Sequence, residues 1–186
     1  MTTAVAALVL LAATATPAAG QNRAMGSFQG LLTGHLGMAT GDAVTESRLV
    51  AGASVAVIEQ DGWGAEIDFG RASDAVSGAQ VLDLHTYMVN GMWMQPQGRI
   101  RPFGLAGVGV MHINGCDSPC GRPATTYDFG FSAGGGVLAI VNDALAVRGD
   151  VRYFGSSAEH ADLRRAENFG FWRVSVGVTF RWAVIP

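Results

Sequence analysis

The sequence predicts an all-β chain that forms an eight-stranded antiparallel up-and-down transmembrane β-barrel, preceded by a signal peptide. Three observations support this fold class. Apolar and polar residues alternate strictly in the last strands, short and long connections alternate along the whole chain, and no apolar run after the first 20 residues is long enough for a membrane helix. The 186 residues are enough for one such barrel domain, which we expect to span residues 21–186.

The clearest strand pattern lies in the last hairpin, expected at 145–156 and 168–182. From Trp172 to Trp182 every second residue is apolar, and the residues between them are polar or small. A period of two predicts a strand with one apolar and one polar face. The preceding strand repeats the pattern, with Arg148, Asp150 and Arg152 on one face.

At the other end of the chain, residues 1–20 have the features of a secretory signal peptide. An apolar core from Ala4 to Ala13 is followed by small residues suited to cleavage near Ala18 to Gly20. The core is shorter than the roughly 20 residues of a spanning helix. No Lys or Arg precedes it, so an N-terminal membrane anchor stays open as an alternative.

The connections define which strand ends lie together. We expect strands at 27–39, 47–59, 63–72, 81–95, 100–114, 126–141, 145–156 and 168–182. Strands 2, 4 and 6 are followed by tight turns of the Asp-Gly, Gln-Gly and Asn-Asp kind. The longer and more polar connections are expected at 40–46, 73–80, 115–125 and 157–167. This alternation predicts short periplasmic turns at one end and four long extracellular loops at the other.

The charged residues within strands are expected to face the lumen. An arginine that faces lipid near the midplane costs about 2–4 kcal/mol, so four of them would cost about as much as the whole stability of a domain. Side chains fill the interior of an eight-stranded barrel. We therefore expect an ion-pair network inside it, made of Glu66, Asp68, Arg148, Asp150, Arg152, Arg173 and Arg181.

Aromatic residues gather near both ends of the strands, as expected for two interfacial girdles. The group near the short turns is Trp63, Trp93, Phe103, Phe180 and Trp182, with Phe28 beside it. The group near the long loops is Tyr127, Tyr153, Phe154, Phe169, Phe171 and Trp172.

Several motifs resemble one known family. The run Arg-Pro-Phe-Gly-Leu-Ala-Gly-Val-Gly-Val at 101–110 is similar to the Pro-aromatic run of small outer-membrane β-barrel domains of the OmpA/OmpX and opacity-protein type. Asn90 to Trp93 and Asp150 to Tyr153 resemble the family's neighbouring stretches. Val178, Phe180 and Trp182 look like the C-terminal signal that the barrel-assembly machinery reads, although Ala183 to Pro186 follow it here.

The resemblance covers about residues 26–182 and implies a location in the outer membrane of a Gram-negative bacterium. It implies a structural or cell-surface role, with binding or adhesion through the four extracellular loops. The partners it implies are outer-membrane lipid, lipopolysaccharide, the barrel-assembly machinery and a surface ligand that the sequence does not identify. We expect no cofactor and no metal, and the net charge of −3 gives no basic footprint for nucleic acid.

Two cysteines, Cys116 and Cys120, lie in the third long connection. In an exported chain, two cysteines four residues apart across a proline favour a loop-closing disulfide. A metal site would need more ligands than His112 adds. The alternative that Cys116 and Cys120 are free thiols is left open.

Three other functions remain as alternatives. Glycine and alanine in the strands at 100–114 and 126–141 would leave room for a narrow channel for small solutes. A lipid A modifying enzyme would use the loop residues Ser156, Ser157, Glu159, His160 and Asp162. One flexible loop is a poor support for a nucleophile, so we expect no enzyme. A soluble lipocalin-like barrel conflicts with the charged face of the last two strands.

Overall fold

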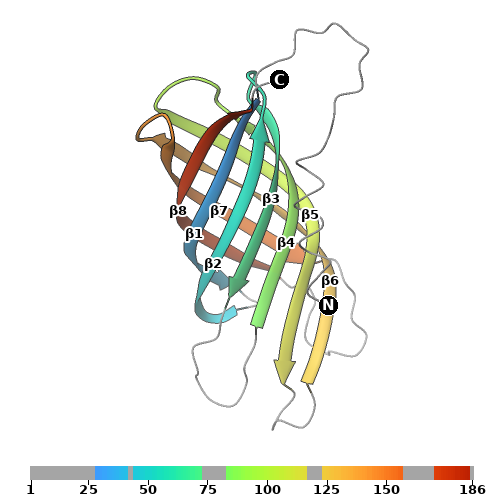
Figure 1. The fold of residues 1–186 in the computed structure, drawn as a ribbon. Coiled ribbons are helices and arrows are strands. Elements are labelled where there is room, and N and C mark those ends of the chain that lie inside the picture. The colour runs from blue at the N-terminus through green and yellow to red at the C-terminus, as the bar shows by residue number, and fades with distance from the viewer. Residues whose placement is uncertain (1–27, 42–43, 73–82, 117–122, 157–169, 185–186) are drawn as a thin grey trace, which may run out of the picture.

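The structure is a computed structural model that describes residues 28–41, 44–72, 83–116, 123–156 and 170–184. Eight strands pair in chain order, each antiparallel to its neighbours, and the last strand pairs with the first to close the ring (Figure 1). The predicted all-β, closed eight-stranded antiparallel barrel is thus confirmed. The expected signal peptide, residues 1–20, lies outside the described residues.

The strand ends agree with the expected ones within three residues. The strands are β1 (Phe28–Gly41), β2 (Val44–Ile58), β3 (Trp63–Ala72), β4 (Asp83–Met94), β5 (Ile100–Cys116), β6 (Pro123–Ile140), β7 (Leu145–Ser156) and β8 (Gly170–Val184). The turns β2–β3, β4–β5 and β6–β7 lie at one end of the barrel, at the top in Figure 1, together with the end of β8. We call this the short-turn end and the opposite end the long-loop end.

The first connection at the long-loop end is shorter than expected. Strand β1 ends at Gly41, β2 begins at Val44, and these two residues pair. The predicted loop at 40–46 was therefore wrong. Residues on both sides of the connection continue β1 and β2, and the prediction missed this because polarity alone does not distinguish a loop from the end of a strand that projects into water. The third connection is also shortened, since β5 and β6 continue to a pair between Cys116 and Pro123. The longer connections are residues 73–82 and 157–169.

The outer face of the barrel is apolar. On β8, Val174, Val176 and Val178 point outward and are 52–62% exposed, and large apolar side chains are exposed on the other strands as well. The β8 side chains that alternate with these valines, such as Arg173, Ser175 and Thr179, are buried in the lumen. This is the reverse of a soluble barrel, whose apolar residues lie inside. The described residues contain no helix that could span a membrane.

The aromatic residues follow the girdle prediction only in part. Trp63, Trp93, Phe180 and Trp182 are exposed on the outer face near the short turns, and Tyr127 and Trp172 near the other end. Three predicted members instead point inward and are buried, namely Phe103, Phe154 and Phe171. The reason is strand parity: Phe154 lies two residues from Arg152, and Phe171 two residues from Arg173, so each shares the lumen face of its arginine. Phe169 lies outside the described residues.

Inward-facing glycines leave the space that the lumen side chains fill. A Cβ at Gly134 of β6 would collide with the backbone of Val151 and Arg152, and one at Gly107 of β5 would lie 2.5 Å from Asn90 Oδ1. Glycine lets the neighbouring strand and its side chain approach closely at these positions. The room that the sequence offered for a narrow passage is therefore occupied in the described lumen.

Candidate functional site

The centre of the lumen holds six charged side chains. Strand β3 supplies Glu66 and Asp68, β7 supplies Arg148, Asp150 and Arg152, and β8 supplies Arg173, and all six are buried. In a closed ring of eight, β3 and β7 are four strands apart and so lie on opposite walls. Ion pairs between them must cross the barrel. We call these six residues the charged belt.

The pairs of the charged belt are short, and most of them are also hydrogen bonds. Arg152 Nη1 lies 2.8 Å from Glu66 Oε1, and Arg148 Nη1 donates to Glu66 Oε2. Arg173 contacts Asp68 through two parallel bonds of 2.9 and 3.1 Å. Arg152 and Arg148 also lie 3.0 and 3.1 Å from Asp150 Oδ2. Three arginines face three carboxylates, so the belt is close to neutral as a whole, as buried charges require.

Polar neighbours hold the carboxylates in place. Ser175 donates to Asp150 Oδ1 at 2.7 Å, and Asn90 donates to Glu66 Oε1 at 3.4 Å. Ser132 in turn donates to the Asn90 side-chain oxygen at 2.6 Å. These bonds satisfy acceptors that the arginines leave open and fix the orientation of each carboxylate.

Apolar side chains close the lumen above and below the charged belt. Toward the short turns lies a buried cluster of Leu31, Ala56, Ile58, Met92, Met94, Phe103, Leu105, Leu138 and Ala146. Toward the other end lies a second cluster of Ala39, Val50, Ala72, Leu84, Met88, Met111, Phe154 and Phe171. An aromatic ring from each cluster lies under a belt arginine: Arg148 is 4.4 Å from the Phe103 ring centre, and Arg173 is 5.0 Å from that of Phe154. The belt is therefore held between two buried apolar layers.

The structure brings together six of the seven residues expected in the network. Arg181, the seventh, lies beside the short-turn mouth, where Nη1 donates to the carbonyl oxygen of Asn142 at 3.3 Å. Arg181 faces inward like Arg173, but it lies eight residues further along β8, toward the short turns. Parity assigns a residue to a face and gives no depth along the barrel axis.

Sequence reasoning missed several polar members of the lumen. His35 Nε2 lies 4.0 Å from Asp68 Oδ2, and Asn90 and Ser132 support Glu66 as described. Glycine and alanine occupy both faces around His35 and Ser132, so alternation gives no signal there. Ser175 could have been found, because it lies two residues from Arg173 in a strand that alternates clearly.

The remaining predicted residues lie elsewhere. Val178, Phe180 and Trp182 point outward on β8, which continues past them to Val184. Cys116 belongs to β5, and the side chains needed for a Cys116–Cys120 bond lie outside the described part. Ser157, Glu159, His160 and Asp162 lie outside it too. Ser156 ends β7, and its hydroxyl donates to Phe129 O at 3.5 Å.

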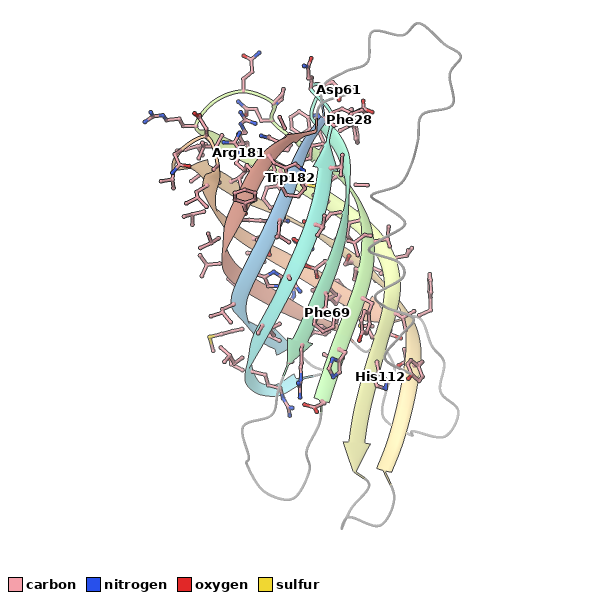
Figure 2. All side chains as sticks on the ribbon, in the orientation of Figure 1. Phe28, Asp61, Phe69, His112, Arg181 and Trp182 are labelled. Atoms are coloured by element: carbon pink, nitrogen blue, oxygen red, sulfur yellow. The ribbon has the colours of Figure 1, made fainter. Side chains whose placement is uncertain are left out.

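A row of rings crosses the outer face near the long loops. The His112 and Tyr127 rings stack at 4.4 Å between centres, His85 lies 5.8 Å from His112, and Phe69 lies 6.2 Å from His85. Figure 2 labels Phe69 and His112 at this level of the barrel. The row spans β3 to β6 and marks the limit of the apolar outer face toward the long-loop end, since Arg71 and Asp83 form an exposed ion pair next to it.

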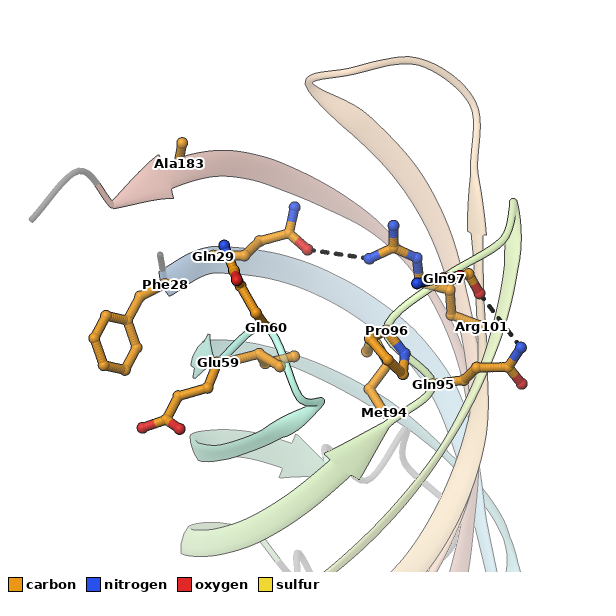
Figure 3. Close-up of a pocket in the computed structure, with 11 residues that line it drawn as sticks. Phe28, Gln29, Glu59, Gln60, Met94, Gln95, Pro96, Gln97, Arg101 and Ala183 are labelled. Carbon is orange, nitrogen blue, oxygen red and sulfur yellow. Dashed lines mark hydrogen bonds between the residues drawn. The ribbon is translucent and has the colours of Figure 1, made fainter. Parts of the chain in front are cut away.

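The short-turn mouth contains a pocket of about 450 Å³ (Figure 3). Its floor is formed by Ile58 and Met94, which belong to the buried apolar cluster on the short-turn side of the charged belt. Its walls carry four glutamines and one arginine: Gln29, Gln60, Gln95, Gln97 and Arg101.

Comparison with known proteins gives a consistent result. A model of the family described as the outer membrane protein beta-barrel domain matches residues 4–180. Neisserial surface protein A has a similar solved structure, with a TM-score of 0.66 at 13% identity over 83% of this chain and 97% of that one. The N-terminal barrel domain of Pseudomonas aeruginosa OprF gives 0.57 at 16% identity over 84% and 98%. No curated protein sequence matches.

A third solved structure is that of Ail, the attachment invasion locus protein of Yersinia pestis, in complex with the heparin analogue sucrose octasulfate. Its TM-score is 0.58 at 12% identity, over 85% of this chain and 100% of that one. At these identities the likeness of the three structures shows the fold.

Proposed function

Because this chain belongs to the outer membrane protein β-barrel family, we propose that it is a closed, non-conducting barrel that acts at the cell surface through its long-loop end. The family and the fold make it a small β-barrel of the outer membrane. The binding role is the proposal. It rests on the filled lumen, which argues against a channel, and on the loops and aromatic side chains of the long-loop end.

The observation that carries the proposal is the charged belt. The ion pairs of Arg148 and Arg152 with Glu66 and Asp68 join opposite walls, and the side chains of Glu66, Asp68 and Arg152 are at most 1% exposed. A water-filled channel would require these groups to be wet and apart. Since each belongs to a pair that crosses the lumen, opening a passage would strand several buried charges at a cost of several kcal/mol. A barrel closed in this way acts through its surfaces.

The long-loop end is the surface that we propose for binding. Barrels of this kind place their longer connections outside the cell. The connections at 73–82 and 157–169 are the longer ones here, and β5 and β6 extend beyond their neighbours at the same end (Figure 1). Exposed aromatic side chains such as Tyr127 and Phe129 lie on the outer face of β6 near this end. Aromatic residues at a rim serve both the lipid interface and recognition.

Four further roles belong to the same proposal. Residues 1–20 direct export and are removed, and Val178, Phe180 and Trp182 present an outward aromatic pattern to the barrel-assembly machinery. Cys116 and Cys120 form a disulfide that closes the connection between β5 and β6. Outer-membrane lipid and lipopolysaccharide surround the apolar outer face. We propose no catalytic activity.

Two measurements test the proposal. Purified protein in planar bilayers should give no discrete conductance steps, because the lumen is filled. Reproducible unitary currents would contradict a closed barrel and indicate a channel. Bacteria that display the protein should attach to surfaces coated with heparin or extracellular matrix. Replacing residues 73–82 and 157–169 with short Gly-Ser linkers should abolish attachment and leave heat-modifiable migration intact. Equal attachment of both strains would contradict a binding role for this end.

A further inference from the structure

The pocket at the short-turn mouth is separate from the surface proposed for binding, and it has an unusual charge arrangement. Two arginines contact the same amide group, that of Gln29. In one orientation of the amide, its oxygen accepts from Arg101 Nη1 at 3.4 Å. In the other, the oxygen accepts from Arg181 Nη2 at 2.7 Å and Nε at 3.2 Å. The second orientation satisfies the amide better, so Gln29 accepts from Arg181, and Arg101 Nη1 then has no acceptor on Gln29. Gln29 and Arg101 line the pocket, and Arg181 adjoins it through its bonds to Gln29.

Neither arginine has a carboxylate partner among the described residues. Arg101 Nε donates to the carbonyl oxygen of Gly98 at 3.1 Å, and Arg181 Nη1 donates to that of Asn142 at 3.3 Å. Within the described part of the chain, both groups thus have neutral acceptors only. This contrasts with the charged belt, where each arginine pairs with an acid. Two like charges beside one neutral amide leave a position suited to an anion.

We propose that the short-turn mouth is a binding site for the terminal carboxylate of a peptide, which Arg101 and Arg181 hold from the two sides of Gln29. In the outer membrane this mouth faces the periplasm. The planar guanidinium group forms two parallel bonds with a carboxylate, which a lysine would not do. The carboxylate lies between the two guanidinium groups, and Gln29 turns its NH₂ group toward it.

A peptide fits the pocket better than a free anion does. The volume of about 450 Å³ is that of a small-ligand site and far exceeds one ion. Primary amides of Gln60, Gln95 and Gln97 line the wall, and such groups both donate to and accept from peptide bonds. Phe28, Ile58, Met94 and Pro96 supply apolar contact beside them (Figure 3). The only acid in the lining, Glu59, points away from the side of Arg101 (Figure 3).

The experiment uses the full barrel in an uncharged detergent and measures peptide binding by calorimetry. The probes are trialanine with a free C-terminus, trialanine amide, acetate and inorganic phosphate. Trialanine should bind, and the amide should bind at least about tenfold more weakly, because a charge-assisted pair is lost. Acetate and phosphate should bind more weakly than trialanine, since they make no contact with the glutamines.

Three substitutions locate the site. Arg101→Gln and Arg181→Gln should each weaken trialanine binding about tenfold or more. Arg99→Gln is the matched control: Arg99 is exposed in the β4–β5 turn beside Arg101, but among the described residues no hydrogen bond joins its side chain to Gln29 or to the pocket lining, so its loss should leave binding unchanged. Gln29→Glu places a carboxylate between the two arginines and should abolish binding while both arginines remain. Heat-modifiable migration verifies that each variant is folded.

Several results would overturn the proposal. One is equal binding of trialanine and its amide, and another is equal loss in Arg99→Gln and Arg101→Gln. Acetate or phosphate binding as tightly as trialanine would make this a site for free anions. Absence of saturable trialanine binding at millimolar concentration, or full binding by Gln29→Glu, would remove the site altogether. None of these results bears on attachment through the long-loop end.

Discussion

Arg152 of β7 and Glu66 of β3 meet across the barrel, with 2.8 Å between Nη1 and Oε1, although their strands lie on opposite walls. A contact of this kind requires the ring to be closed, because an open sheet would hold the two strands far apart. It also fills the lumen at its centre. Closure of the barrel and exclusion of a pore therefore depend on the same set of side chains.

Loss of one belt arginine should destabilise the barrel strongly. In Arg173→Ala, Asp68 loses both bonds of a bidentate pair while it remains buried. Breaking such a pair costs about 3–5 kcal/mol. Urea unfolding of the refolded protein in detergent measures the loss. Arg71→Ala is the control, since the exposed Arg71–Asp83 pair at 3.4 Å should contribute at most about 1 kcal/mol. Equal effects of the two substitutions would contradict the buried belt.

The inward glycines of β6 should not tolerate even a methyl group. A Cβ at Gly134 meets the backbone oxygen of Val151 and lies 2.8 Å from Arg152 Cα, so the strands must shift. Gly134→Ala should lower the free energy of unfolding by about 1–3 kcal/mol. At Gly149 of the adjacent strand a Cβ has no neighbour within 4 Å, so Gly149→Ala should cost nothing. The same urea titration compares them, and a tolerant Gly134 would mean that the lumen is looser than described.

The outward valines of β8 should report membrane depth. Val176 is 60% exposed on the outer face near the middle of its strand. In a bilayer, Val176→Arg should cost about 2–4 kcal/mol. Leu145→Arg, at the start of β7, should cost no more than about 1 kcal/mol because the side chain lies at the interface. Unfolding from lipid vesicles measures both, and a depth-independent cost would argue against this position of the hydrocarbon.

The aromatic end of β8 should matter for assembly in cells. Phe180 and Trp182 face outward, where the assembly machinery can contact them. The double variant Phe180→Ser/Trp182→Ser should reduce the folded, heat-modifiable form in outer-membrane fractions. Val174→Ser and Val178→Ser test whether the position near the end of β8 matters. Val174 lies outside the proposed signal of Val178, Phe180 and Trp182, so Val174→Ser should not change assembly, whereas Val178→Ser should increase the assembly defect. Normal assembly of the double variant would show that these residues are not the signal.

The sequence predicted the barrel and most of the charged belt because β7 and β8 alternate without interruption. Parity alone placed Arg148, Arg152 and Arg173 on one face, and the cost of charge in lipid identified that face as the lumen. The same parity would have placed Phe154 and Phe171 inside. General aromatic preference for the interface led to the opposite expectation, and for these rings it was wrong.

Other features could not be read from the sequence for physical reasons. Glycine carries no face preference, so the lumen positions of β5 and β6 became visible only with the register, which aligns Gly134 with Arg152. Polarity does not separate a loop from a strand that projects into water, so residues 40–46 were assigned to a loop although Gly41 and Val44 pair. The convergence of Arg101 and Arg181 on Gln29 joins three strands and has no local pattern.

A double-mutant cycle on Glu66→Gln and Arg152→Gln, followed by urea unfolding, is the most direct test of a lumen closed by ion pairs across its width. If the two side chains meet as described, the cycle should give a coupling energy of more than about 1 kcal/mol. Losses that add within about 0.3–0.5 kcal/mol would mean that the two residues do not interact, and the closed barrel would lose its support.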